Sequence, residues 1–146
     1  MNADKKKVKD FLYEQETYLI RKACFNVWNK MGSAFKESAI DKALTLELQK
    51  QGFKVEDQKR INIIYDGEKV GVYIPDKIID EKILLELKRK SFLTKQDRNN
   101  FWNYLHGSFY KLGLLINFGD EKLEIKRVIY DKARPVVKYT QRNSAV

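Results

Sequence analysis

Residues 75–88 read PDKIIDEKILLELK, and this stretch decides the fold. Two apolar runs, 78–79 and 83–85, flank the polar residues 80–82, a pattern that predicts a strand, a turn and a second strand. The second run is continuously apolar, as in a strand that is covered on both faces. The stretch therefore predicts an antiparallel strand pair in a sheet with other elements packed on both sides.

Two carboxylates face each other across this predicted pair. If the turn centres on Glu81, Asp76 lies directly opposite Glu86, with the two Cβ atoms roughly 4.5 to 5.5 Å apart. Because side chains alternate along a strand, Glu86 and Lys88 share a face. Like charges so placed destabilise a sheet unless something positive lies between them. A divalent cation such as Mg²⁺ fits this place, and the geometry suits metal-assisted phosphodiester cleavage. A solvated Glu-x-Lys surface pair is the competing interpretation, and the residues alone leave both open.

The bulk properties bound the class of protein. At 146 residues the chain is long enough for one core, and we expect a single domain over residues 1–130 followed by a basic, flexible tail over 131–146. The 29 Lys and Arg exceed the 20 Asp and Glu by 9, which favours an anionic partner such as nucleic acid. No apolar run approaches the roughly 20 residues of a membrane span, so we expect a cytoplasmic protein without a membrane partner.

Cysteine and histidine are too few to build a metal centre. Cys24 and His106 are each the single residue of their type, which excludes an intrachain disulfide and a cysteine-based zinc site. We expect both residues to have packing roles.

Helical spacing of apolar residues predicts three helices. The first spans about 8–31, with a possible break near Gln15, and stops at Gly32. The second begins near Ser33 as a plausible cap and ends at Gly52. The third follows a Thr94 cap and ends at Gly113. Its apolar stripe is Trp102, Leu105, Phe109 and Leu112. Aromatic residues interleaved with Lys and Arg also occur in base-stacking surfaces, but this spacing favours core packing.

Extended segments occupy the remaining chain. Segments are expected at 53–56, 60–65, 69–74, 76–79, 82–88, 113–118 and 122–130. Asp66-Gly67 is a strong hairpin signal between the second and third of these, and Gly119-Asp120 predicts a later turn. We expect an α/β fold with a central mixed sheet flanked by helices, in the order α-α-β-β-β-β-α-β-β.

Glu37 occupies an unusual place in the second predicted helix. It lies three residues before Ile40, and so on the stripe formed by Ile40, Leu44 and Leu48, which we expect to face the core. An acid at a helix start interacts favourably with the helix dipole by roughly 0.3 to 1 kcal/mol. The residues leave open whether Glu37 is such a helix-start acid or a site acid.

Several segments together resemble a known family. They are GSAFKES at 32–38, KVGVYIPD at 69–76, ELK at 86–88, NYL at 103–105, GLLINFG at 113–119 and LEIKR at 123–127. In this order and spacing they resemble the GxxExxY proteins, a family placed in the PD-(D/E)XK nuclease superfamily. The resemblance covers roughly residues 15–130 and implies a restriction-endonuclease-like fold. It departs at Ala34, where the family name has Gly, and at Ile40, where it has Tyr.

The resemblance also implies roles for individual residues. Asp76, Glu86 and Glu37 would bind Mg²⁺ or Mn²⁺, and Lys88 would orient or activate the attacking water. Asn100 stands where a Gln is usual and is a possible supporting residue. The implied function is hydrolysis of nucleic-acid phosphodiesters, DNA or RNA, through contacts with the backbone. Alternatives are an inactive nucleic-acid-binding or complex-forming module on the same fold, and a small scaffold that forms a homodimer through its first helix.

Overall fold

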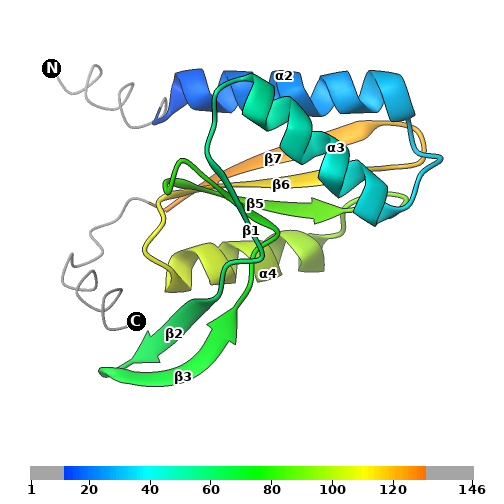
Figure 1. The fold of residues 1–146 in the computed structure, drawn as a ribbon. Coiled ribbons are helices and arrows are strands. Elements are labelled where there is room, and N and C mark those ends of the chain that lie inside the picture. Colours follow the sequence, from blue (N-terminus) through cyan, green and yellow to red (C-terminus); the bar gives the residue numbers. More distant parts are fainter. Residues whose placement is uncertain (1–11, 131–146) are drawn as a thin grey trace, which may run out of the picture.

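A five-stranded sheet forms the centre of the protein (Figure 1). The structure, a computed structural model, describes residues 12–130, so the start of the predicted first helix and the predicted tail lie outside it. The strands follow the order β1-β4-β5-β6-β7, and only the β5 and β6 pair is parallel. Their bounds are Val55–Asp57 for β1, Lys77–Ile79 for β4, Ile83–Lys88 for β5, Leu112–Phe118 for β6 and Leu123–Ile129 for β7.

The register of β4 and β5 confirms the predicted turn. Lys77 pairs with Leu85 and Ile79 with Ile83, so the pairing is symmetric about Glu81. The φ angles of Asp80 and Glu81 are 50° and 59°, and the turn is closed by a hydrogen bond from Lys82 N to Ile79 O of 2.9 Å. Two consecutive positive φ angles match the right-handed twist of a hairpin. One further step of this register puts Asp76 opposite Glu86.

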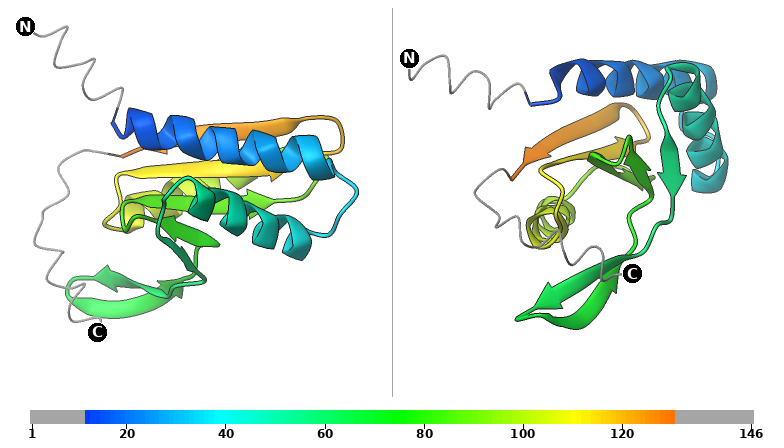
Figure 2. Two further views of the ribbon diagram at one scale, coloured as in Figure 1. Left: turned by 45° about the horizontal axis from the view of Figure 1, so that its top comes forward. Right: turned by 60° about the vertical axis from the view of Figure 1, so that its left-hand side comes forward.

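Helices cover both faces of the sheet (Figures 1 and 2). Helices α2 (Glu14–Met31) and α3 (Glu37–Lys50) pack on one face, and α4 (Lys95–Gly107) packs on the other. Alternate residues of β5 separate these two layers, because Leu85 joins the α2 and α3 core whereas Leu84 joins the α4 core. The predicted mixed sheet with buried layers on both sides is therefore confirmed. No helix within residues 12–130 is long and apolar enough to cross a membrane.

The starts and ends of the helices differ in part from the prediction. The stop at Gly32, with φ 63°, is confirmed, but Ser33 does not cap α3, whose N-cap is Lys36. Thr94 caps α4 as predicted, and a reciprocal hydrogen bond from its backbone to Asp97 completes a capping box. Helix α4 ends at Gly107, six residues before the predicted Gly113, because Leu112 already belongs to the fully buried strand β6.

The predicted stripe on α4 is consequently wrong in part. Phe101 and Leu105 are buried against the sheet, whereas Trp102 is 42% exposed and Phe109 lies beyond the helix end. The buried positions, Phe101 and Leu105, are four residues apart, so the face that meets the sheet is turned by about one residue from the predicted stripe. Aromatic side chains of α4 therefore reach the surface.

The Asp66-Gly67 hairpin forms a separate small sheet. Strands β2 (Ile61–Tyr65) and β3 (Glu68–Tyr73) pair only with each other, with φ angles of 49° and 80° at the two turn residues. This hairpin projects beside α4 instead of extending the central sheet, as both views show (Figures 1 and 2). Five strands precede α4, one for each of the five extended segments expected between residues 53 and 88, so the order α-α-β-β-β-β-α-β-β is one strand short. The first of the five, β1, pairs with β4.

Candidate active site

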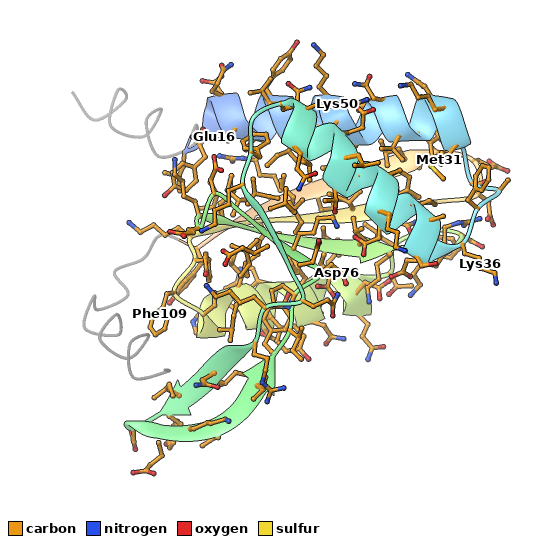
Figure 3. The ribbon with its side chains drawn as sticks, in the orientation of Figure 1. Glu16, Met31, Lys36, Lys50, Asp76 and Phe109 are labelled. Carbon is orange, nitrogen blue, oxygen red and sulfur yellow. The ribbon has the colours of Figure 1, made fainter. Side chains whose placement is uncertain are left out.

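Asp76 is fixed to the central sheet by its own carboxylate. It directly precedes β4, and its Oδ2 accepts a hydrogen bond of 2.7 Å from the backbone N–H of Leu87 on β5. Its Oδ1 accepts a longer bond of 3.4 Å from Gln58 Nε2. Asp76 therefore lies where the chain leaving the hairpin meets the central sheet (Figure 3). The half-buried carboxylate is held beside the strand that carries Glu86.

Glu86 and Lys88 open into a small pocket between the sheet and α4. The pocket has a volume of about 210 Å³. Its lining residues are Glu86, Lys88, Asp97, Asn100, Phe101, Tyr104 and Leu115. Leu85 and Leu87 belong to the core on the other face, so the predicted alternation along β5 is confirmed. Lys88 is the last residue of β5, which puts the pocket near the carboxyl end of that strand, where open α/β sheets commonly bind ligands.

The two carboxylates lie in a partly dry and negatively charged place. Burial raises the pKa of Glu86 to about 7, with a further contribution from the charge of Asp76. Burial also raises the pKa of Asp76. Lys88 and the Tyr73 hydroxyl act in the opposite direction on Glu86, but they do not cancel the effect. A cation placed between the two acids would stabilise their ionised forms, because opposite charge nearby favours the charged state.

Glu37 approaches this place from α3. It is the first residue of that helix and is exposed, so the predicted position on a core-facing stripe is wrong. Partial burial and the charge of Asp76 raise the pKa of Glu37, while Lys88 lowers it. The charges of Asp76 and Lys88 therefore act on the Glu37 carboxylate although it comes from a different layer. Its place in the first turn also agrees with a helix-start acid, so the two interpretations are compatible.

Asp76 and Glu86 are the donor set that fits a divalent cation. Within residues 12–130, no group of three or more His, Cys, Asp or Glu residues is gathered closely enough to hold a metal by itself. Mg²⁺ does not need such a cage, since it usually keeps several waters and binds one or two carboxylates together with substrate phosphates. Two carboxylates opposite each other beside a polar pocket match that requirement.

Lys88 brings positive charge to the same pocket. It lines the pocket together with Glu86, and its charge lowers the pKa of both Glu86 and Glu37. In the described part of the chain, no salt bridge commits Lys88 to a single carboxylate. A lysine so placed can contact a phosphate as a compact point charge.

Tyr73 is a site residue that sequence reasoning missed. Its hydroxyl donates a hydrogen bond of 3.2 Å to Glu86 Oε1, and its ring stacks on Tyr104 of α4 at 4.1 Å between centroids. Burial, reinforced by the charge of Glu86, raises the pKa of the Tyr73 phenol, so it remains a donor at neutral pH. Tyr73 comes from the separate hairpin, and no local pattern in the sequence indicates that this hairpin folds back onto β5.

Lys77 is a second missed residue, and it lies directly beside Asp76 in the chain. Its side chain is fully buried and contacts Asp41 and Thr45 of α3 and Asp57 of β1. The distances from Nζ are 2.7 Å to Thr45 Oγ1 and 2.8 Å to Asp57 Oδ1. Alternation along the strand could have indicated its burial, because Lys77 lies on the same face of β4 as the buried Ile79. This ion cluster ties α3, which carries Glu37, to the strand that follows Asp76.

The other predicted residues have distinct places. Asn100 lines the pocket on the α4 wall. Asp97 lines it too, but its carboxylate is committed to the cap and to Lys90 at 2.8 Å. Burial acts to raise the pKa of Asp97, yet the bonds from Lys90 and Thr94 outweigh it and lower the value to about 2. Cys24 is fully buried, as its predicted packing role requires.

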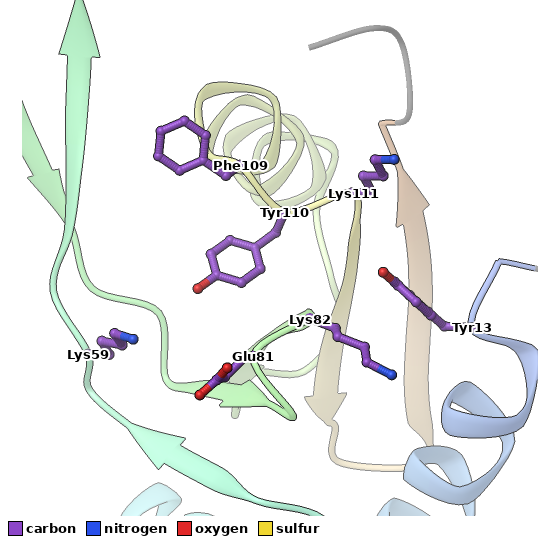
Figure 4. A pocket seen from close by; sticks show the side chains of 7 residues that line it. All are labelled: Tyr13, Lys59, Glu81, Lys82, Phe109, Tyr110 and Lys111. Carbon is purple, nitrogen blue, oxygen red and sulfur yellow. The ribbon is translucent and has the colours of Figure 1, made fainter. Parts of the chain in front are cut away.

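A larger hollow of about 430 Å³ shares no lining residue with this pocket. Figure 4 shows the side chains that line it. Its lining residues are Tyr13, Lys59, Glu81, Lys82, Phe109, Tyr110 and Lys111. Lys82 pairs with Glu16 at 3.2 Å and Glu81 with Lys54 at 2.6 Å, so charged groups of this hollow already have partners. It contains no opposed carboxylates, and the pocket at Glu86 is the better candidate for chemistry.

Comparison with known proteins gives the family of the chain. Residues 14–128 match the family model described as the PD-(D/E)XK nuclease superfamily. No curated protein and no solved structure matches the chain. The match spans the acids, Lys88 and the sheet that holds them.

Proposed function

The chain belongs to the PD-(D/E)XK nuclease superfamily, and we propose that it is a metal-dependent nuclease that hydrolyses nucleic-acid phosphodiester bonds. Nucleases of this superfamily generally use divalent metals, and its fold, a mixed sheet flanked by helices, is the one seen here. We propose further that the chain is a GxxExxY protein. The observation that carries the function is the opposition of Asp76 and Glu86 beside a pocket that also contains Lys88.

Each acid has a defined task in this proposal. Asp76 and Glu86 would hold Mg²⁺ or Mn²⁺, and the exposed Glu37 would be the additional acid at the rim. A bound divalent ion supplies a lowered pKa for the attacking water and neutralises charge on the phosphate. The backbone N–H of Leu87 and the Tyr73 hydroxyl hold the two carboxylates in position, which reduces the reorganisation needed when the ion binds.

Lys88 acts on the substrate from the same strand face. Its ammonium stabilises the charge that develops on the phosphate and orients the attacking water by hydrogen bonding. Asn100, on the facing helix, supports the phosphate or the water from the opposite wall of the pocket. The net charge of +9 attracts the nucleic-acid backbone to the protein, while the acids remain reserved for the cation.

Metal binding and cleavage together test this function. Mn²⁺ affinity is measured by calorimetry for the wild type, Asp76→Asn, Glu86→Gln and the control Glu81→Gln. Glu81 lies in the turn between β4 and β5, and its carboxylate pairs with Lys54 on the surface. Cleavage is then assayed with Mg²⁺ or Mn²⁺ on single-stranded, duplex and structured DNA and RNA. We expect both site variants to lose metal binding and cleavage, with the control unchanged. Cleavage that survives in Asp76→Asn would contradict the proposal.

Binding without turnover is the second candidate. It is favoured by Asn100, a shorter amide that lines the pocket where the resembling family usually has Gln. A shorter side chain reaches less far toward a phosphate or a water. Salt-dependent binding of nucleic acid with no cleavage under either metal would support this candidate over the nuclease.

A further inference from the structure

An exposed aromatic ring stands at the rim of the candidate active site. Tyr104 of α4 is 44% exposed, although it also lines the pocket with Glu86, Lys88 and Asn100. Large apolar side chains at the surface commonly mark places where a partner binds when they adjoin a functional pocket. The position of Tyr104 raises the question of what covers its ring during function.

One face of the Tyr104 ring is already supported from behind. The ring of Tyr73 stacks against it at 4.1 Å with an angle of 5° between the ring planes. Tyr73 is only 6% exposed, and its hydroxyl is bonded to Glu86. Glu86, Tyr73 and Tyr104 therefore form one continuous assembly from the acid to the surface. A ring held in this way is a rigid platform, so little conformational freedom is lost when a ligand stacks on it.

The size of the pocket limits what lies inside it. Its volume of about 210 Å³ is below the roughly 300 to 1,000 Å³ of pockets that enclose a drug-sized ligand. A phosphate with a hydrated cation fits such a space, whereas the sugar and base attached to that phosphate do not fit with them. The nucleoside must then lie at the rim, where the Tyr104 ring is exposed.

We propose that Tyr104 is a stacking platform for an unpaired base next to the phosphate in the pocket. The proposal rests on the proposed function and names its substrate class, which is single-stranded nucleic acid. Bases in a continuous duplex are stacked on each other and offer no free face to a protein ring, whereas unpaired bases stack on aromatic side chains without regard to sequence. The tyrosine ring therefore selects for strandedness and not for sequence.

Trp102 provides a matched control on the same helix. It is 42% exposed, almost as much as Tyr104, but it does not line the pocket. Its ring instead stacks on His106 at 4.9 Å and meets Tyr130 edge-on. Trp102→Ala therefore tests the loss of an exposed aromatic ring on α4, whereas Tyr104→Leu tests the loss of the ring beside Glu86.

The test measures binding without cleavage, in EDTA and at low salt. Fluorescence anisotropy gives the affinity of a labelled single strand and of a duplex hairpin for Tyr104→Leu, Tyr104→Phe and Trp102→Ala. Leucine still covers Tyr73 but offers no flat ring, and phenylalanine keeps the ring. We expect Tyr104→Leu to lose about 5- to 150-fold in single-strand affinity, the loss typical of one stacked base. The other two variants should bind like the wild type, and duplex affinity should not change.

A second measurement reports stacking directly. A single strand that contains 2-aminopurine should lose fluorescence on binding the wild type and Tyr104→Phe, but not on binding Tyr104→Leu. Unchanged single-strand affinity in Tyr104→Leu, or an equal loss for duplex, overturns the proposal. Tyr104-dependent stacking without any metal-dependent cleavage would uphold the platform and reject the nuclease. Cleavage that is lost in Asp76→Asn but unchanged in Tyr104→Leu would uphold the nuclease and reject the platform.

Discussion

Replacing Lys77 by methionine should strongly destabilise the protein. Lys77 is fully buried, and its ammonium is the shared partner of Asp41 and Asp57. Methionine has a similar length but no charge, so the variant leaves two carboxylates close together without their cation. Removal of one partner from a buried ion pair typically costs about 3 to 5 kcal/mol.

The structure places the expected cost near the lower end of this range. The side chains of Asp41 and Asp57 are 30% and 45% exposed, so water relieves part of the penalty after Lys77 is removed. We therefore expect a loss of about 3 kcal/mol in the free energy of unfolding. For a chain of this length, that loss corresponds to a fall in Tm of about 6 to 12 °C. Urea denaturation and thermal melts monitored by circular dichroism measure both quantities.

A compensated variant separates charge imbalance from lost packing. In Lys77→Met combined with Asp41→Asn and Asp57→Asn, no charge remains uncompensated, and we expect most of the lost stability to return. Replacement of a whole buried ionic group by neutral residues is often close to neutral. A loss below about 1 kcal/mol in Lys77→Met, or an equal loss in the triple variant, would refute the reasoning that the carboxylates need this ammonium.

The remaining predictions concern pH and packing. Folding raises the pKa of Glu86 from 4.5 to about 7, so the folded protein binds more protons than the unfolded chain between these two pH values. The free energy of unfolding should therefore fall by up to about 3 kcal/mol as the pH rises from 4.5 to 7. Urea midpoints measured across this pH range should depend less on pH in Glu86→Gln than in the wild type. Gly113→Ala would put a Cβ atom 2.6 Å from Phe101 Cζ and should cost about 1 to 3 kcal/mol in urea melts, less with Phe101→Leu present. Thr94→Ala should cost about 1 kcal/mol in the same melts, and a urea midpoint equal to that of the wild type would contradict a working cap.

Elements set by local patterns could be predicted from the sequence. The β4 and β5 register followed from two apolar runs around a three-residue turn, because a hairpin turn fixes which residues face each other. Gly32 and Thr94 likewise set helix ends through their own backbone or side chain. Helix ends without a local signal were misplaced. Ser33 has the chemistry of a cap, but its backbone lies before the Lys36 position at which α3 begins.

The site was predictable only where one strand pair carries it. Asp76 and Glu86 could be paired in advance because their relation depends on the symmetry of a single turn. Tyr73 could not be added, since its bond to Glu86 depends on the separate hairpin folding back toward α4. Tyr104 was missed for a related reason. The helical spacing shows which residues share a face, but the packing of Phe101 and Leu105 against the sheet decides which face is buried.

Lys77 shows the physical origin of this limit. Alternation along β4 puts its side chain on the face of Ile79, but burial of an ammonium is tolerable only with anions at hand. Those anions, Asp41 and Asp57, come from a helix and an edge strand that no local pattern joins to β4. Each half of the pair therefore looks like an ordinary surface charge by itself. Polar groups from different layers meet only when those layers pack, so the sequence of each segment alone does not show that they interact. The opposed acids lie on one strand pair and could be predicted, whereas the residues that hold them in place come from other layers and could not.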